Sequence, residues 1–268
     1  MKETFLVRMT WPEAQEALAE KRVVVVPTGS IEQHGPHMPV GTDYLASAAI
    51  ANGIGERSKS VIVTPAIPVG FADYHRDFPG TLSVSANTLN AYYTELVSNL
   101  VQHGADHILF VNSHGGNSAT IDDVCYKLRR QGVVAAEIVW WNILSTLTPE
   151  NSPAGHGDWI ETALMLATNP TAVKMDKAKV PRVNDTNVPS LSLQSPHIVR
   201  FRGVPVRVRL KTNDFAPDGH MPEAELSPTA DITIPPTAGT PELGKKLMDV
   251  VVGFIVDFVE EFKKLELR

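Results

Sequence analysis

Short apolar runs alternate along the chain with segments that carry apolar residues at helical spacing. Four runs are almost continuously apolar, which predicts strands at residues 22–27, 61–67, 107–112 and 133–141. Helical patterns occupy residues 43–57, 87–104 and 117–132 between them. Strands that are apolar on both faces are typical of a parallel sheet covered on both sides. The pattern therefore predicts an α/β fold, with a mostly parallel sheet and helices on both faces.

The pattern changes in the second half of the chain. Residues 158–167 predict one more helix, and residues 169–196 are rich in Pro, Asn and Ser, as expected of a long excursion over the surface. The stretch "RFRGVPVRVRLKT" alternates charged and apolar residues and predicts a strand with one solvent-exposed face. Residues 240–267 predict a long packed helix. No repeat or linker separates two cores, so we expect one domain over residues 1–268.

Composition narrows the class of protein. With 268 residues, 43% hydrophobic and 20% charged, the chain is typical of a globular protein. The net charge of -6 argues against nucleic acid as a partner, because a phosphate backbone requires a basic surface. No stretch approaches the roughly 18 apolar residues that a membrane span requires. The N-terminus lacks the apolar core of a secretory signal.

The single cysteine, Cys125, fits a reducing compartment and predicts a cytoplasmic protein without intramolecular disulfides. It falls on a predicted helix face, "IDDVCYKLRRQG". We expect a packed core thiol there rather than a nucleophile, because free cysteines are often buried.

Three polar clusters follow predicted strands. They are "GSIEQHGPHMPVGTD" at residues 29–43, "NSHGGNS" at 112–118 and "GHGDWIETALML" at 155–166. In open α/β sheets, ligands bind beyond the carboxyl ends of the strands. The clusters bring two imidazoles and three carboxylates to such places, and this mixed set suits Zn²⁺, Mn²⁺ or Fe²⁺ better than calcium. The candidate ligands are Glu32, His34, Asp43, His114 and Glu161.

Each candidate also has a structural alternative. Asp43 opens a predicted helix and could be its N-cap, and His34 could be a hydrogen-bonded core histidine. Glu161 lies three residues after Asp158, the spacing of a capping box. The joint occurrence of these residues at three strand ends favours a metal site.

The "NSHGGN" stretch has two interpretations. Gly115 and Gly116 allow backbone N–H groups to approach a substrate, or they form a tight strand-to-helix turn capped by Asn117 or Ser118. The motif G-x-S-x-G is absent, as is G-x-G-x-x-G, so neither a serine hydrolase nor a dinucleotide site is supported. The tryptophans could line a pocket or pack in the core: Trp140, Trp141 and Trp159.

Four motifs taken together, "PTGSIEQHGPHMPVGTD", "FPGTLSVSANT", "VNSHGGN" and "HGDWIETALML", resemble the creatininase (creatinine amidohydrolase) family in order and spacing. The resemblance runs from about residue 10 to residue 166. It implies a two-metal hydrolase on an α/β fold, assembled as a homohexamer. By this resemblance one metal is held by Glu32, Asp43 and His114, and the other by His34 and Asp43, with Asp43 bridging.

Two departures from creatininase itself bear on the substrate. A Tyr-Glu pair follows the matched histidine there and supplies a ligand, whereas Gly115 and Gly116 stand here, so Glu161 is the candidate to complete the second site. A tryptophan also precedes the catalytic histidine there, where this chain has Asn151, Ser152 and Pro153. Both differences argue against creatinine itself. The HGGN form resembles family branches that act on other small amides, formamides or cyclic ketones.

These observations predict a metal-dependent hydrolase that opens a small cyclic amide or related C–N bond. It would use two divalent ions per chain, Zn²⁺ and/or Mn²⁺, with Fe²⁺ as a further option. His156 would carry a proton to the leaving nitrogen, and Gly115, Gly116 and Trp159 would contact the substrate. The alternatives are the same site acting on a formamide or a cyclic ketone, and a non-catalytic metal- or metabolite-binding protein.

Overall fold

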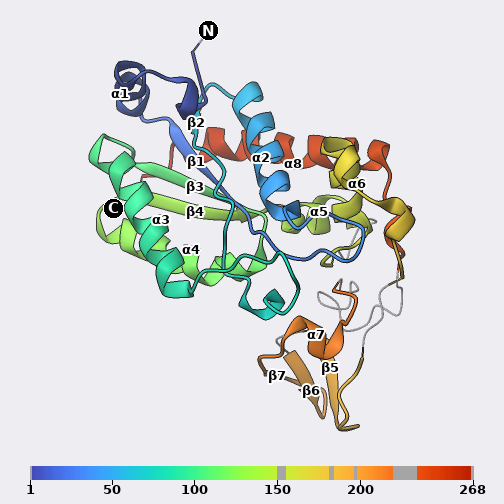
Figure 1. The fold of residues 1–268 in the computed structure, drawn as a ribbon. Coiled ribbons are helices and arrows are strands. Elements are labelled where there is room, and N and C mark those ends of the chain that lie inside the picture. The colour runs from blue at the N-terminus through green and yellow to red at the C-terminus, as the bar shows by residue number, and fades with distance from the viewer. Residues whose placement is uncertain (1, 150–154, 181–183, 196–197, 220–233, 267–268) are drawn as a thin grey trace.

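The main sheet has four parallel strands. The computed structural model describes residues 2–149, 155–180, 184–195, 198–219 and 234–266. Its strands are β1 (Val23–Thr28), β2 (Val61–Val63), β3 (His107–Asn112) and β4 (Val134–Val139), in the order β2-β1-β3-β4 (Figure 1). Val25 of β1 pairs with Val63 on one side and Leu109 on the other. The predicted parallel sheet is confirmed.

Helices cover both faces of this sheet. One face is covered by α2 (Thr42–Arg57), α5 (Trp140–Leu147), α6 (Trp159–Thr168) and α8 (Pro241–Phe262), and the other by α1 (Trp11–Ala19), α3 (Ala86–Gln102) and α4 (Ser118–Arg130). Alternate residues of β1 serve the two layers: Val23 and Val25 face the first, Val24 and Val26 the second. Cys125 packs at the edge of the second layer, which agrees with a packed core thiol.

The strand order places a topological switch point at the carboxyl edge of the sheet. The chain leaves β1 for β2 on one side, then crosses back to β3 on the other side of β1. The loops after β1 and β3 therefore diverge, and such a switch point is where open α/β sheets bind ligands.

The fourth strand is shorter than its sequence predicts. The prediction of a strand through residue 141 was wrong at its end, because β4 stops at Val139 and α5 begins at Trp140. Trp140, Ile143 and Leu144 are buried on one side of this helix. Their spacing is helical, so the apolar run contains two elements rather than one.

A second sheet forms within the later part of the chain. The strands β5 (Leu191–Ser195), β6 (Ile198–Phe201) and β7 (Val204–Arg207) are antiparallel and stand away from the main sheet in Figure 1. The prediction of one strand after residue 200 was wrong. Arg202 and Gly203 both have positive φ, 50° and 80°, as a two-residue hairpin turn requires. Residues 169–196, for which we expected a surface excursion, also contain a strand, β5.

Short elements complete the described chain. The helix α7 (Thr212–Phe215) leads from the small sheet back to the carboxyl edge of the main sheet, and the remaining elements are 3₁₀ turns: Leu6–Arg8, Asp73–His75, Gly115–Asn117, Pro170–Ala172, Met175–Lys177 and Pro236–Ala238. None of the helices in the described ranges combines the length and apolar character that crossing a bilayer requires. A single domain over residues 1–268 stays a prediction.

The helix α8 lies in close contact with α6. Its N-cap residue Thr240 accepts a hydrogen bond from the backbone N–H of Leu243. One turn later the two backbones touch, because a Cβ atom placed on Gly244 would lie 1.9 Å from the carbonyl oxygen of Ala163. Gly253, on the same helix, has no atom within 4 Å of that position.

We expect Gly244→Ala and Gly253→Ala to change stability in opposite directions. The first forces two helices apart and should lower the free energy of unfolding by about 1–3 kcal/mol. The second removes backbone freedom without a clash and should raise it by about 0.5–1 kcal/mol. Urea unfolding of both variants measures the difference. Equal stabilities would contradict this packing of α6 on α8.

Candidate metal centre

The five predicted ligands come together at the carboxyl edge of the sheet. Glu32 and His34 lie in the loop after β1, Asp43 in the first turn of α2, His114 after β3 and Glu161 in the first turn of α6. All five are buried, with relative exposures from 0% for Glu32 and His34 to 8% for Glu161. Buried carboxylates and imidazoles need partners, so their convergence defines a site rather than a surface cluster.

Asp43 lies at the middle of this cluster. Its Oδ1 accepts a hydrogen bond from His34 Nε2 at 2.9 Å, and its Oδ2 lies 3.2 Å from His114 Nδ1. Glu32 Oε2 lies 3.1 Å from His114 Nδ1, and Glu161 Oε2 lies 3.7 Å from His34 Nε2. The ligand atoms form three groups, and within each group they lie within 4.8 Å of one another: Glu32–Asp43–His114, His34–Asp43–Glu161 and Glu32–His34–His156. Asp43 belongs to the first two.

The capping alternative for Asp43 was wrong. The N-cap residue of α2 is Gly41, which makes no side-chain cap, and Asp43 is the second residue of the helix. Its carboxylate instead faces His34 and His114. The helix N-terminus adds a favourable field for that negative charge.

The two histidines are oriented by backbone carbonyls. His34 Nδ1 donates to the carbonyl of Glu32 at 3.1 Å, and His114 Nε2 donates to the carbonyl of Phe71 at 2.8 Å. A carbonyl only accepts, so the nitrogen available for ligation is Nε2 in His34 and Nδ1 in His114. These are the nitrogens that face the carboxylates. Metal-ligating histidines are commonly held in this way.

The carboxylate oxygens support a cation site. Glu32 Oε1 and Asp43 Oδ2 are buried and accept no aligned hydrogen bond from the described residues, although the imidazole nitrogens of His75 and His114 lie 3.3 and 3.2 Å away. A buried carboxylate oxygen without a donor is costly unless a positive charge lies beside it. The mixed nitrogen and oxygen donors match those that bind Zn²⁺ and Mn²⁺. The residues present therefore fit a pair of divalent ions sharing Asp43.

Glu161 combines the two roles that its spacing allowed. Asp158 is the N-cap of α6 and accepts from the backbone N–H of Glu161 at 2.9 Å. The Glu161 carboxylate in turn accepts from the N–H of Gly157 at 2.7 Å, one residue before the cap. The same carboxylate lies beside His34. The cap thus holds Glu161 where it can also serve as a ligand.

No side chain fits at Gly116. A Cβ atom there would lie 2.2 Å from the carbonyl oxygen of Phe71 and 2.4 Å from His114 Nε2. A ligand cannot be supplied from this position without moving the loop, which leaves Glu161 as the second carboxylate near His34, besides Asp43. At Gly115 a Cβ atom would make an ordinary 3.9 Å contact with Trp141. Trp159 is buried in the core layer that contains α8. Substrate contacts of Gly115, Gly116 and Trp159 stay predictions.

Burial and charge shape the protonation of the ligands. Burial alone would lower the pKa of His34, but the carboxylates of Asp43 and Glu161 outweigh it and raise the pKa to about 10. Burial also opposes the charged form of His114, yet Glu32 and Asp43 hold its pKa well above the usual range. Burial raises the pKa of Glu161 to about 8, against the effect of the His34 imidazole. Without metal, protons supply the positive charge that the carboxylates need.

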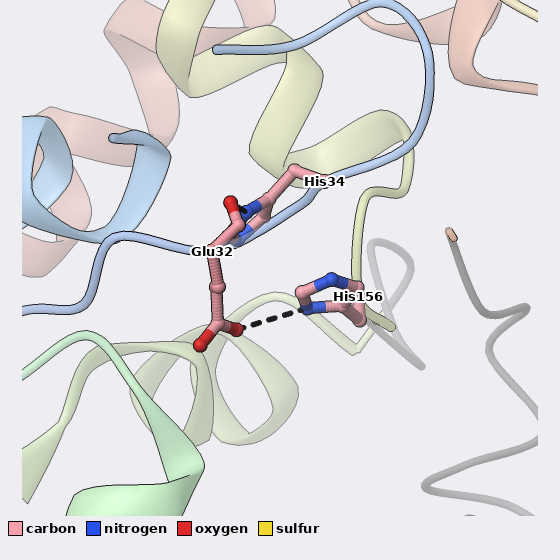
Figure 2. A group of neighbouring side chains, drawn as sticks. All are labelled: Glu32, His34 and His156. Carbon is pink, nitrogen blue, oxygen red and sulfur yellow. Dashed lines mark hydrogen bonds and ion pairs between the residues drawn. The ribbon is translucent and has the colours of Figure 1, made fainter. Parts of the chain in front are cut away.

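His156 lies beside this cluster in a different state. Its Nε2 donates to the carbonyl of Gln33 at 2.6 Å, so Nδ1 carries the lone pair and lies 3.7 Å from Glu32 Oε1 (Figure 2). The ring lies between those of His34 and His75: it is tilted by 34° against the first, with centroids 4.2 Å apart, and stacked on the second, with centroids 4.5 Å apart. Burial and the neighbouring His34 and His75 hold the pKa of His156 well below its usual range. A neutral imidazole therefore faces the site.

Sequence reasoning missed several polar residues of the site. His75 Nε2 lies 3.3 Å from Glu32 Oε1, and Ser30 Oγ donates to Glu32 Oε2 at 2.8 Å. Gln33, next to Glu32, contacts both His75 and His156. His75 lies in the loop after β2, in the 3₁₀ turn Asp73–His75, where a lone histidine gives only a weak signal. Ser30 and Gln33 give no comparable signal.

A buried set of metal-ligand types at the switch point of an α/β sheet is typical of metal-dependent enzymes. A family model for creatininase (creatinine amidohydrolase) matches residues 7–259, and the chain belongs to the creatininase family. The resemblance drawn from the sequence is thereby confirmed.

The relatives that match this chain are named for different activities. A creatinine amidohydrolase from Pseudomonas putida is 30% identical over 66% of this chain and 76% of its own length. A mycofactocin precursor peptide peptidase from Mycolicibacterium smegmatis is 32% identical over 58% of this chain and 61% of its own. A 3-dehydro-scyllo-inosose hydrolase from Thermotoga maritima is 25% identical over 60% and 55%. The chain thus matches less than two thirds of the length of the peptide peptidase and of the inosose hydrolase.

Solved structures of creatininase are similar along almost the whole chain. A Zn–Zn form of a creatininase variant has 26% identity and a TM-score of 0.72, covering 98% of this chain and 99% of that one. A manganese form has 26% identity and a TM-score of 0.72, covering 97% and 99%. The fold is that of creatininase.

We expect metal uptake to release protons and to strengthen as the pH rises. The pKa values of His34, His114 and Glu161 are all raised, so these groups carry protons at neutral pH that ligation must displace. Titration of metal-free protein with Zn²⁺ in dilute buffer containing a pH indicator measures the release. An affinity that is independent of pH between 6 and 8, without proton release, would contradict this charge arrangement.

Proposed function

We propose that this protein is a metal-dependent hydrolase that opens a small cyclic amide or a related C–N bond. The observation that carries the proposal is the shared position of Asp43 between two groups of ligand atoms, Glu32–Asp43–His114 and His34–Asp43–Glu161. A carboxylate placed in this way can hold two cations close together, as two-metal hydrolases require. Membership of the creatininase family supports the same reaction class.

Different residues of this chain bind the metal ions and transfer the proton. When bound, two divalent ions polarise a carbonyl and make water more acidic. Five side chains would hold these ions: Glu32, His34, Asp43, His114 and Glu161. His156, neutral and with Nδ1 turned toward Glu32, accepts a proton from the attacking water and passes it to the leaving nitrogen.

The substrate we propose is not creatinine. Gly115 and Gly116 replace a pair of side chains that creatininase uses, and no side chain fits at Gly116. Asn151, Ser152 and Pro153, which stand where creatininase has a tryptophan, lie outside the described residues. The relatives named as a peptide peptidase and an inosose hydrolase support a family site that serves more than one bond.

A second candidate is cleavage of a formamide or of a cyclic ketone ring at the same centre. The similarity to the inosose hydrolase supports the ketone. A non-catalytic metal-binding protein is less well supported, because it would not need a neutral imidazole beside the ligands. For the ions we propose Zn²⁺ and/or Mn²⁺, supported by the two metal forms of creatininase, with Fe²⁺ as an alternative. The hexamer and the cytoplasmic location stay predictions.

We expect the metal-loaded protein to hydrolyse a small cyclic amide, and Glu161→Gln to abolish most of this turnover. Glutamine still accepts the Gly157 N–H, so the cap and the melting temperature should be preserved. As a neutral amide it is a poorer ligand than a carboxylate, so metal content should fall from about two ions per chain to about one. A panel of cyclic amides, formamides, peptides and cyclic ketones, with elemental analysis of both proteins, measures this.

Glu95→Gln is the matched control, because it makes the same chemical change at an exposed position on α3. It should keep both metals and full turnover. Two metals and normal turnover in Glu161→Gln would show that Glu161 is only a cap. Stoichiometric metal without turnover of any compound in the panel would favour the non-catalytic alternative.

A further inference from the structure

His75 is a buried histidine that the reaction outlined above does not use. It ends the 3₁₀ turn Asp73–His75 after β2, and its relative exposure is 0%. Its Nε2 lies 3.3 Å from Glu32 Oε1, and its ring stacks on that of His156 with an interplanar angle of 17°. Among the described residues it belongs to none of the three groups that could hold a metal. Its place is therefore beside the ligands rather than among them.

The side-chain amide of Gln33 fixes the tautomer of His75. Gln33 Oε1 accepts from the N–H of Gly35 at 3.0 Å, and Gln33 Nε2 donates to the carbonyl of Gly219, so the amide can face only one way. Gln33 Nε2 also lies 2.9 Å from His75 Nδ1. An amide nitrogen only donates, so Nδ1 of His75 accepts and the ring proton is on Nε2. That N–H is on the side of Glu32.

Two further contacts agree with this assignment. Gln33 Nε2 is 2.9 Å from His156 Nε2 as well, but that nitrogen already donates to the Gln33 carbonyl and cannot accept. Thr212 Oγ1 lies 2.7 Å from His75 Nδ1, so the single lone pair of Nδ1 is shared between the Thr212 hydroxyl and the Gln33 amide. Either donor leaves His75 with an accepting Nδ1 and a protonated Nε2.

We propose that His75 is a positioning residue of the metal centre: its Nε2–H, 3.3 Å from Glu32 Oε1, attracts that oxygen and so directs Glu32 Oε2 to the metal. The other oxygen is already turned that way, because Oε2 lies beside His114 Nδ1 and accepts from Ser30. Partners of this kind hold a ligand in one orientation and raise the affinity of the site. The assignment rests on the metal centre of the proposed function.

This assignment connects the segment after the small sheet to the metal centre. Thr212 belongs to α7, and Gly219 follows the same helix. Lys211 pairs with Asp77, two residues after His75, at 3.0 Å. A change at Thr212 touches no ligand, yet it should reach the metal through His75.

Metal affinity of His75→Leu and His75→Gln tests the proposal. Leucine removes the N–H, whereas the amide of glutamine can still donate to Glu32. We expect the dissociation constant for Zn²⁺, measured by competition with a chromophoric chelator, to rise about 10–100-fold in His75→Leu and to stay within a few-fold of wild type in His75→Gln. The visible spectrum of the Co²⁺-loaded proteins, which reports ligand geometry, should change only in His75→Leu.

Thr212→Val and Thr212→Ser form a second pair that does not depend on His75→Leu folding. Valine should weaken Zn²⁺ binding several-fold, and serine, which keeps the hydroxyl, should not. Wild-type affinity and cobalt spectra in both His75→Leu and Thr212→Val would overturn the positioning role while leaving the proposed hydrolase intact. Loss of a whole metal equivalent in both His75 variants would make His75 a ligand instead. A wild-type protein that binds no metal would overturn the centre itself.

Discussion

The charge balance of three buried carboxylates governs the site. Glu32, Asp43 and Glu161 are removed from water within a few ångströms of one another, and burial of unpaired negative charge costs several kcal/mol per group. Imidazole protons supply the compensating charge in the metal-free state, which is why the pKa values of His34 and His114 are raised. We propose that divalent cations replace those protons on binding, so that folding and metal binding use the same electrostatic arrangement.

The fold delivers this arrangement from segments far apart in the sequence. The switch point between β1 and β3 brings the loop of Glu32 and His34 next to His114. Backbone carbonyls aim the two imidazoles, the cap of α6 holds Glu161, and Gln33 orients His75. Burial lowers the pKa of His156, and the neighbouring imidazoles of His34 and His75 lower it further. One cluster thus contains two imidazoles that favour the protonated form and one that stays neutral.

The sequence predicted the sheet, its covering helices and all five candidate ligands, because continuous apolar runs and polar strand ends are local signals. It could not decide whether Glu161 is a cap or a ligand, because both roles are compatible with the same spacing. In the structure the Glu161 carboxylate takes part in the cap of α6 and also lies beside His34. His75 was missed because β2 has only three residues and a lone histidine in a loop carries little information. Thr212 lies 137 residues from His75, a contact that no local pattern encodes. The hairpin turn at Arg202 was missed because charged and apolar residues alternate through it without interruption.

We propose that Asp43 bridges two metal ions, and anomalous X-ray diffraction from crystals grown with Mn²⁺ can locate them. We expect two anomalous peaks about 3.5–4 Å apart. One should lie against Glu32 and His114 and the other against His34 and Glu161, with Asp43 between them. A single peak, or a peak held by Glu32, His34 and His156 without Asp43, would contradict it.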